Sequence, residues 1–155
     1  MISPYITNSI IESIVGLVLI RAGERSNAMT VSLFSEVAHH PTTLWVSIDQ
    51  HSFTHRLLQT QPNFTLAVLN QNQREIAMRC GSVSGSDEDK VSQLSLYTNH
   101  NDFLFLQGAL ASTACKVRTS VEVDNHTLFI ADILEAELES RSSHLRQLLL
   151  SDLVE

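Results

Sequence analysis

Residues 16–49 constrain the fold more than any other part of the sequence, because they have the pattern of three successive β-strands. An apolar run at residues 18–20 is followed by turn-forming residues at 23–27, and this succession predicts a β-hairpin. The third strand is expected at residues 43–49. Three strands in succession with short connections favour an antiparallel sheet, so the sequence predicts a mainly β fold.

The second of these strands is more polar than a buried strand usually is. Side chains alternate between the two faces of a strand, so Ala28, Thr30 and Ser32 share one face. Met29, Val31 and Leu33 share the opposite face. A face of small side chains lets a flat polar ring approach the backbone closely. The alternative is that Thr30 and Ser32 simply face solvent.

The rest of the sequence predicts further strands, short helices and turns. Strands are expected at residues 64–69, 103–106, 111–123 and 127–139, with a glycine- and serine-rich loop at 81–87 and a tight turn at 124–126. Helices are expected after a cap at Ser52, at residues 73–80, and at residues 144–150 after a cap at Ser142 or Ser143, with an amphipathic lead-in over residues 1–15. This count predicts one domain, residues 1–155, built as an antiparallel barrel with peripheral helices.

Composition limits the partners and the location of the chain. Seventeen acidic and ten basic residues give a formal net charge of −7, which disfavours non-specific binding to nucleic acids. No run reaches the roughly 20 apolar residues of a membrane span, and no signal-peptide pattern opens the chain, so we expect a cytoplasmic protein. Cys80 and Cys115 form no CxxC pair, so reduced thiols are expected.

Five segments together resemble one known family. They are residues 27–32 (Asn-Ala-Met-Thr-Val-Ser), Pro41 with the strand at 44–48, residues 80–90, residues 108–117 and residues 126–130. In this order and at this spacing, the sequence resembles the flavin reductase-like, FMN-binding split-barrel family over nearly the whole chain. The resemblance implies a split β-barrel, FMN as the cofactor, NAD(P)H as a transient co-substrate, and a homodimer with two composite sites.

The resemblance places the flavin ring on the second strand. Backbone N–H groups and hydroxyls around residues 30–32 would meet the polar edge of the ring. The candidate cofactor-binding residues in this region are Asn27, Ala28, Met29, Thr30, Val31, Ser32 and Ser47. The sequence has no GxGxxG motif, so NAD(P)H is expected to bind over the flavin and not in a dinucleotide fold of its own.

The flavin phosphate needs donors that work against the negative charge of the chain. A helix that begins after Ser52 would present unpaired N–H groups, to which the side chains of Ser52, Thr54 and His55 would add. An ordinary capped surface helix is the alternative. His51 and His55 also have the spacing of a metal pair, but no third ligand is evident and no metal is expected.

A second candidate for the phosphate lies at the start of the predicted loop. The residues are Arg79, Cys80, Gly81 and Ser82. The family usually has an arginine where this chain has Ser86, and Arg79 could compensate for its loss. The alternative is that the segment is only a mobile connection.

His126 is the candidate catalytic residue, in contact with the nicotinamide or with the open face of the flavin. The family usually has Gly-Asp-His at this turn, and here the turn is Asp124-Asn125-His126. Hydride transfer to a flavin is direct, so the expected role is positioning and not proton transfer. The alternative is a polar turn residue that bonds within its own hairpin.

Three functions therefore stay open. The first is an NAD(P)H-dependent flavin reductase that passes reduced flavin or electrons to an oxygenase or another redox acceptor. The second is an FMN-holding electron carrier that does not oxidise NAD(P)H itself. The third is a non-catalytic barrel that binds another flat ligand such as haem.

Overall fold

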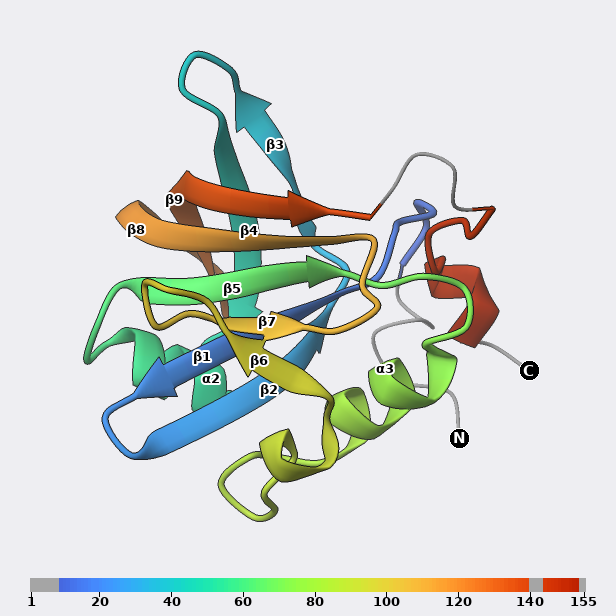
Figure 1. Ribbon diagram of the computed structural model, residues 1–155. Coiled ribbons are helices and arrows are strands. Elements are labelled where there is room, and N and C mark those ends of the chain that lie inside the picture. Colours follow the sequence, from blue (N-terminus) through green and yellow to red (C-terminus); the bar gives the residue numbers. More distant parts are fainter. Residues whose placement is uncertain (1–8, 140–143, 154–155) are drawn as a thin grey trace.

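A curled antiparallel sheet of seven strands forms the centre of the computed structural model, which describes residues 9–139 and 144–153 (Figure 1). The strands of this sheet are β1 (Gly16–Ala22), β2 (Arg25–Val31), β3 (Phe34–Ala38), β4 (Thr43–Asp49), β5 (Asn63–Val68), β8 (Ala111–Val123) and β9 (His126–Leu138). Their order across the sheet is β2-β1-β5-β8-β9-β4-β3. The predicted mainly β split barrel is confirmed.

The two end strands of the sheet are neighbours in the sequence, and this forces the sheet to curl. Only Ser32 and Leu33 lie between β2 and β3. A flat sheet of this order would separate its end strands by roughly 29 Å, at about 4.8 Å per strand, whereas a link of two residues spans only about 10 Å. The sheet therefore bends round until both ends share one corner at Ser32 and Leu33. From this corner, β2 and β3 run in different directions (Figure 1).

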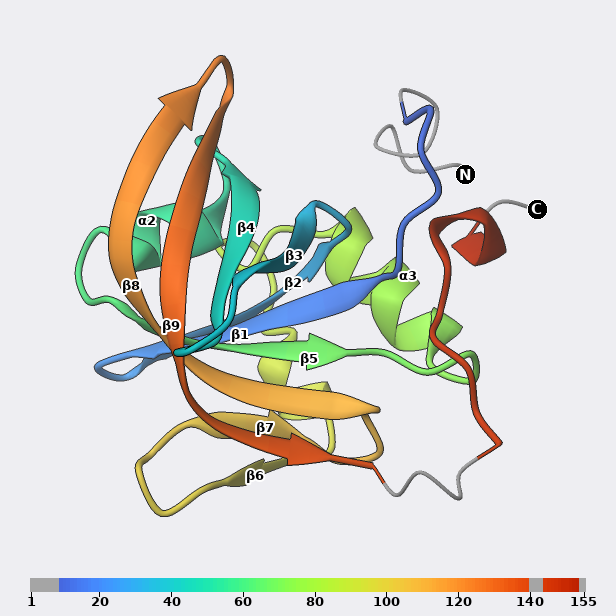
Figure 2. The ribbon, with the colours of Figure 1, turned by 90° about the horizontal axis from the view of Figure 1, so that it is seen from above.

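Two short helices and a small hairpin complete the described part of the chain. Helix α2 (Phe53–Leu58) lies at one end of the barrel, and helix α3 (Arg74–Ser82) lies beside β2 (Figure 2). Strands β6 (Leu96–Thr98) and β7 (Leu104–Leu106) form a separate two-stranded sheet. Single 3-10 turns occur at η1 (Val91–Gln93) and η2 (Leu150–Leu153).

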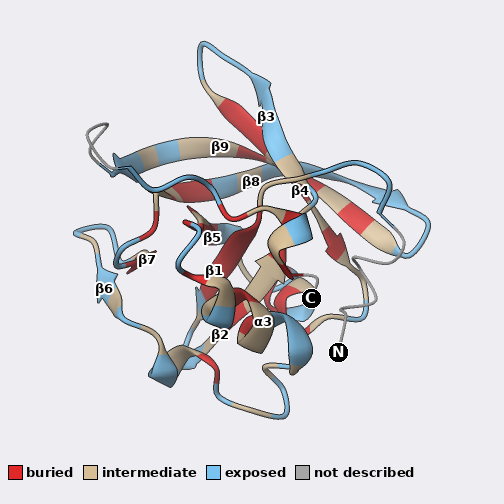
Figure 3. Cartoon of the chain, turned by 90° about the vertical axis from the view of Figure 1, so that its right-hand side faces the viewer, coloured by how far each residue is buried: buried red, intermediate tan, exposed pale blue. Residues whose placement is uncertain are grey.

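Both faces of the sheet are covered around β1, which is therefore buried along most of its length (Figure 3), whereas β3 and the hairpin end of β8 are largely exposed. Val18 and Ile20 point into the barrel, where they join a cluster that includes Phe53 and Leu57 of α2. Leu17 and its alternate neighbours lie on the outer face, in a second cluster closed by α3, β7 and the C-terminal segment. A strand covered on both sides reads as a continuous apolar run, as residues 17–20 do.

Three predictions about the elements are wrong. The stretch 16–49 holds four strands and not three, because the predicted second strand ends at Val31 and β3 begins at Phe34. Residues 9–15 form no helix, and the side chains of Ile10 and Ile11 are 97% and 73% exposed. Residues 1–8, which carry the rest of that prediction, lie outside the described residues.

The third error concerns the closing helix. Residues 144–149 are not helical, because single β-bridges join Gln147 to Asn70 and Leu149 to Ile14. The apolar residues of this segment therefore pack in an extended conformation against the second cluster, on the outer face of the sheet, and not as one face of a helix. The proposed caps, Ser142 and Ser143, lie outside the described residues.

In the described ranges, none of the helices has both the length and the apolar character that crossing a membrane requires.

Candidate functional site

Strand β2 presents the alternation that the sequence predicts, but α3 covers its small face. Ala28 belongs to the outer cluster, whereas Val31 belongs to the barrel interior. The Thr30 hydroxyl donates to the Ala77 carbonyl of α3 at 2.6 Å. A Cβ added at Gly81 would lie 3.3 Å from the Cβ of Thr30, so the helix packs closely there. The expectation of an open small face is therefore wrong, since the protein's own helix occupies it.

The edge of β2, unlike its face, is free. Strand β2 stands at the end of the sheet and pairs only with β1. Among the described residues, no backbone hydrogen bond joins residues 27–32 to anything other than β1. An unpaired strand edge presents a row of N–H and C=O groups. Main-chain donors around Thr30, Val31 and Ser32 are thus available at the edge.

Asn27 is the point at which β2, α2 and the loop after α3 meet. Its side chain is 2% exposed, and its Nδ2 donates to the Thr54 hydroxyl at 2.9 Å. Its Oδ1 is buried without a partner among the described residues. A Cβ added at Gly85 would lie 1.9 Å from this Oδ1 and 2.8 Å from the Phe53 ring. Only glycine lets the loop approach Asn27 so closely.

The side chains at the start of α2 are engaged within the protein. The Ser52 hydroxyl caps the helix, because it accepts from the His55 N–H at 3.1 Å and donates to the Asp49 carbonyl at 2.8 Å. Thr54 is 0% exposed and accepts from Asn27. The predicted cap at Ser52 is confirmed. The hydroxyls proposed as a phosphate anchor have internal partners in this structure.

His55 of α2 and His126 lie at the end of the sheet where Asp49 of β4 pairs with the start of β9. The His55 Nε2 is 2.9 Å from the Thr127 hydroxyl, and its ring centroid is 5.6 Å from that of Phe129. Burial lowers the pKa of His55, against the opposing charges of Asp49 and Glu122. His126 opens β9 opposite Asp49, and its Nδ1 is 2.8 Å from the Asn125 Oδ1.

The turn before His126 and the position of Ser47 follow the sequence pattern. Asp124 has a φ of 50°, the left-handed conformation that Asp tolerates better than most residues. The backbone of His126 is held by Gln50, whose side chain donates to its carbonyl at 2.9 Å. The Ser47 N–H donates to the Leu33 carbonyl at 2.9 Å, so β4 contacts the corner between β2 and β3.

The segment after α3 is ordered by two cations. Arg79 pairs with Glu88, while its Nε is buried without a partner among the described residues. Lys90 is 3% exposed, and its ammonium group donates to the carbonyls of Cys80 and Val83. Burial raises the pKa of the Cys80 thiol and lowers that of Lys90. Gly81 and Ser82, predicted in the loop, belong to the end of α3.

Two arginines near Asn27 were missed by the sequence predictions. The guanidinium carbon of Arg25 lies 4.4 Å from the centre of the Phe53 ring, and that of Arg56 lies 5.2 Å from it. Arg25 comes from β2 and Arg56 from α2, so nothing in their spacing along the sequence shows that they converge. Cation–π contacts of this kind hold the two side chains over one aromatic ring.

A cavity of about 520 Å³ opens beside these residues. It is lined by Glu24, Arg25, Ser26, Phe53, Gly85, Ser86, Asp87, Glu88, Asp89, Val91 and Ser92. Four of these side chains are carboxylates, so the interior of the cavity disfavours an anion. Arg25 lines the cavity and Arg56 lies beside it; both are exposed and are the cations nearest to Phe53 among the described residues.

The structure thus divides the predicted site residues into two groups. Asn27, Ala28 and Thr30 of β2 meet Thr54 and the end of α3, where Arg79, Cys80, Gly81 and Ser82 lie. Ser52, His55 and His126 form the second group around the β4–β9 end. Helix α2 connects them, because Thr54 faces Asn27 and His55 faces Thr127. In the described part of the chain, no group of three or more His, Cys, Asp or Glu side chains could hold a metal ion.

A curled barrel whose end strands meet at one corner, with a short helix at one end and a second helix on its outer face, has the fold of the split-barrel class. Residues 10–151 match the flavin reductase like domain family, and the chain belongs to this family.

Individual relatives agree with this assignment. The chain is 29% identical over 117 residues to the reductase component of an FADH₂-dependent resorcinol hydroxylase from Rhizobium sp. (strain MTP-10005), which covers 74% of this chain and 64% of that protein. A relative from Archaeoglobus fulgidus is also matched over 64% of its length, so the chain spans less than two thirds of both proteins.

Solved structures show the same fold. An FMN-binding protein from Thermus thermophilus superimposes with a TM-score of 0.79 at 24% identity, covering 83% of this chain and 72% of that one. An NADH:FAD oxidoreductase from Streptomyces globisporus, in complex with NAD and FAD fragments, gives a TM-score of 0.81 at 20% identity, covering 92% and 83%.

Proposed function

We propose that this chain is an NAD(P)H:flavin oxidoreductase that holds FMN at the free edge of β2. The observation that carries the proposal is the meeting of two segments at Asn27: residues 27–32 and the segment that ends at Lys90. Both segments carry the family resemblance, and they are far apart in the sequence. Reduced flavin or its electrons would pass to an oxygenase or another redox acceptor, as the name of the Rhizobium relative suggests.

The residues around Asn27 fit a flavin in three respects. The Asn27 Oδ1 is a buried acceptor without a partner among the described residues, and such atoms normally have one. The edge of β2 offers main-chain groups in a row, which suits the polar rim of a flat ring. The neighbouring cavity of about 520 Å³ lies within the size range of ligand sites.

The phosphate of FMN would be held by Arg25 and Arg56 at the Phe53 side of the cavity and not among its carboxylates. The four carboxylates that line the cavity repel an anion, whereas the two exposed guanidinium groups over Phe53 attract one. This placement revises the expectation for Ser52 and Thr54, whose hydroxyls have internal partners. Bound FMN would supply a ring that accepts a hydride from NAD(P)H.

The protein's own contribution to the reaction is positioning. His126 is the first residue of β9 and is partly exposed. We propose that its side chain contacts NAD(P)H while the nicotinamide is transiently bound. The His126 ring is oriented by Asn125 and its backbone by Gln50. A second copy of the chain would complete the site. The β8–β9 hairpin projects from the barrel (Figure 2) and exposes Val121 and Val123 by about half.

Anaerobic reduction of the purified protein tests this proposal. We expect FMN to be retained or to bind on addition. Its flavin absorbance band at about 450 nm should bleach when either NADH or NADPH is added. Retained FMN that neither nicotinamide reduces would favour an electron carrier. Failure to bind FMN, with binding of haem instead, would favour the non-catalytic barrel and contradict the proposal.

A further inference from the structure

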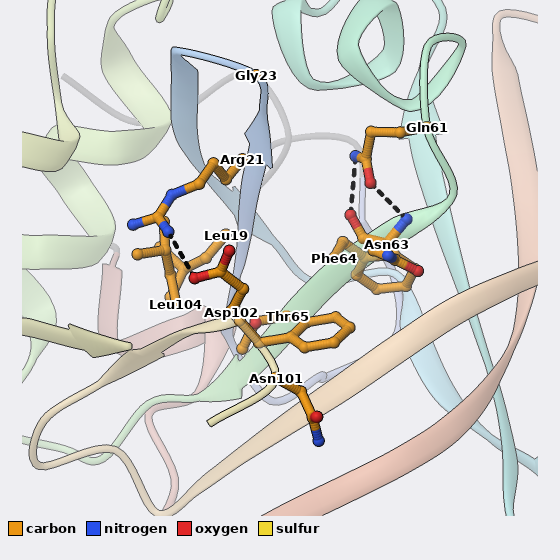
Figure 4. Close-up of a pocket in the computed structure, with 11 residues that line it drawn as sticks. Leu19, Arg21, Gly23, Gln61, Asn63, Phe64, Thr65, Asn101, Asp102 and Leu104 are labelled. Atoms are coloured by element: carbon orange, nitrogen blue, oxygen red, sulfur yellow. Dashed lines mark hydrogen bonds and ion pairs between the residues drawn. The ribbon is translucent and has the colours of Figure 1, made fainter. Parts of the chain in front are cut away.

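A second cavity, of about 320 Å³, lies between β1, β5 and the turn that joins β6 to β7 (Figure 4). It is separate from the cavity beside Asn27, because Arg21 and Gly23 line the one and Glu24, Arg25 and Ser26 line the other. The β1–β2 turn therefore stands between them. Nothing in the proposed flavin chemistry uses this second cavity.

Thr65 provides an unpartnered hydroxyl in the wall of this cavity. Its side chain belongs to a residue that is 1% exposed, and its Oγ1 makes no hydrogen bond to any described residue. Thr65 lies opposite Leu19 of β1 and Ala114 of β8 in the sheet, and neither of these side chains can accept or donate. Buried hydroxyls are normally satisfied, so this one is available to a ligand that enters the cavity.

An ion pair between two lining residues of unequal exposure, Arg21 and Asp102, lies at the solvent side of the cavity. The Arg21 guanidinium lies 3.5 Å from the Asp102 carboxylate, and the two side chains are 37% and 86% exposed. Such a solvated pair contributes little to stability. Asp102 is the member that can return to water at little cost, whereas Arg21 is held closer to the cavity. An incoming ligand would therefore replace Asp102 and pair with Arg21.

Part of the remaining wall is apolar. Leu19 and Leu104 are almost fully buried, and Phe103 is half-buried beside them. Figure 4 shows Leu19 and Leu104 close to Arg21, with Thr65 beyond Asp102. Gln61 is not available to a ligand, because its amide bonds to both backbone groups of Asn63. Asn63 and Asn101 also line the cavity, but both are exposed, whereas the unpartnered Thr65 hydroxyl is buried beside the apolar surface.

We propose that this cavity binds a small organic carboxylate. Its carboxylate pairs with Arg21 in place of Asp102, its apolar body packs on Leu19 and Leu104, and a hydroxyl or carbonyl oxygen beyond that body bonds to Thr65. Arg21 is the only cation among the described residues that line the cavity, so it sets the sign of the ligand's charge. The volume of about 320 Å³ limits the ligand to a small molecule.

Three probe molecules test the proposal by NMR titration of the ¹⁵N-labelled full chain: benzoate, its neutral isostere benzamide, and 4-hydroxybenzoate. We expect benzoate to bind with a Kd on the order of millimolar, with chemical-shift changes at the amides of Arg21, Thr65 and Asp102. Benzamide should bind at least about tenfold more weakly than benzoate. 4-Hydroxybenzoate is expected to bind more tightly than benzoate. No saturable binding of either carboxylate, or equal binding of benzamide, overturns the proposal.

Two variants assign the contacts. Arg21→Gln should weaken both carboxylates about tenfold or more, whereas Arg118→Gln, which removes a similar exposed pair with Asp132, should not. Thr65→Val should make 4-hydroxybenzoate bind no more tightly than benzoate. It should not lower the midpoint of thermal unfolding, because the hydroxyl that it removes makes no hydrogen bond to any described residue. A lower midpoint, or an unchanged preference, overturns the role of Thr65.

A competition experiment separates this site from the flavin site. Saturating FMN should leave the Kd of 4-hydroxybenzoate unchanged, since the β1–β2 turn divides the two cavities. Displacement by FMN would show that the carboxylate occupies the flavin site, and would overturn the proposal while leaving the proposed reductase function intact.

Discussion

The ammonium group of Lys90 donates to the carbonyl of Cys80 at 3.0 Å, at the C-terminal end of α3. A second hydrogen bond, 2.9 Å long, runs to the carbonyl of Val83. The last carbonyls of a helix have no partner within the helix, and a cation there also interacts favourably with the helix dipole. Lys90 thus fixes the end of α3, and with it the loop that reaches Asn27.

Lys90→Met should lower the free energy of unfolding by about 1–3 kcal/mol, because one buried and one partly buried carbonyl lose their donor. The measurement is urea denaturation followed by far-UV circular dichroism. Lys116 is exposed and serves as the matched control, so Lys116→Met should change the free energy by less than about 0.5 kcal/mol. Equal effects of the two substitutions would contradict the role given to Lys90.

Gly85→Ala should displace the loop from Asn27. The added Cβ would lie 1.9 Å from the Asn27 Oδ1, so one of the two must move. We expect faster cleavage within residues 83–88 under limited proteolysis, with mass spectrometry to locate the cuts. Ser84→Ala, in the same loop, is the control. Unchanged cleavage in the Gly85 variant would mean that the loop does not rest on Asn27.

Arg25→Gln and Arg56→Gln should each weaken FMN binding by roughly tenfold or more, since each removes a charge-assisted bond to the phosphate. Isothermal titration with FMN and with riboflavin, which lacks the phosphate, gives the comparison. Riboflavin affinity should be nearly unchanged in both variants. An equal loss for both ligands would show that the arginines act through Phe53 packing and not through the phosphate.

His55 should make the stability of the fold depend on pH. Its pKa in the folded protein lies below the ordinary value of 6.5, so the unfolded chain takes up a proton first as the pH falls. The stabilisation is complete above 6.5 and is lost as the pH drops through the lowered pKa. Unfolding at about pH 7.5 and about pH 5.5 should show a larger loss in the wild type than in His55→Gln. His51→Gln, at an exposed histidine, should behave as the wild type does.

Much of the architecture could be predicted because it depends on local patterns. The long strands at 111–123 and 127–139, the cap at Ser52 and the helix at 73–80 carry turn signals, capping side chains or a strand-forming composition in the sequence itself. The helix predicted at residues 144–150 was wrong because of tertiary contacts. The apolar residues of this segment suit a helix, but bridges to Ile14 and Asn70 hold it extended. Such long-range pairing overrides local preference.

The candidate site was predicted in part. Residues 27–32 and 80–90 were singled out, and the structure brings them together at Asn27. The covering of Thr30 by α3 could not be foreseen, because alternation tells which face a side chain takes and not what packs on that face. The convergence of Arg25 and Arg56 over Phe53 depends on how α2 packs against β2, and the positions of these residues along the sequence do not show that packing.

The two-residue corner at Ser32 and Leu33 has a consequence for how such chains tolerate changes of length. Val31 is locked opposite Gly16, and Phe34 is locked opposite Val46. Losing or gaining one residue between them would turn every side chain of one strand to the wrong face. Insertions should therefore be accepted at the β1–β2 turn, at Gly23, and rejected at this corner.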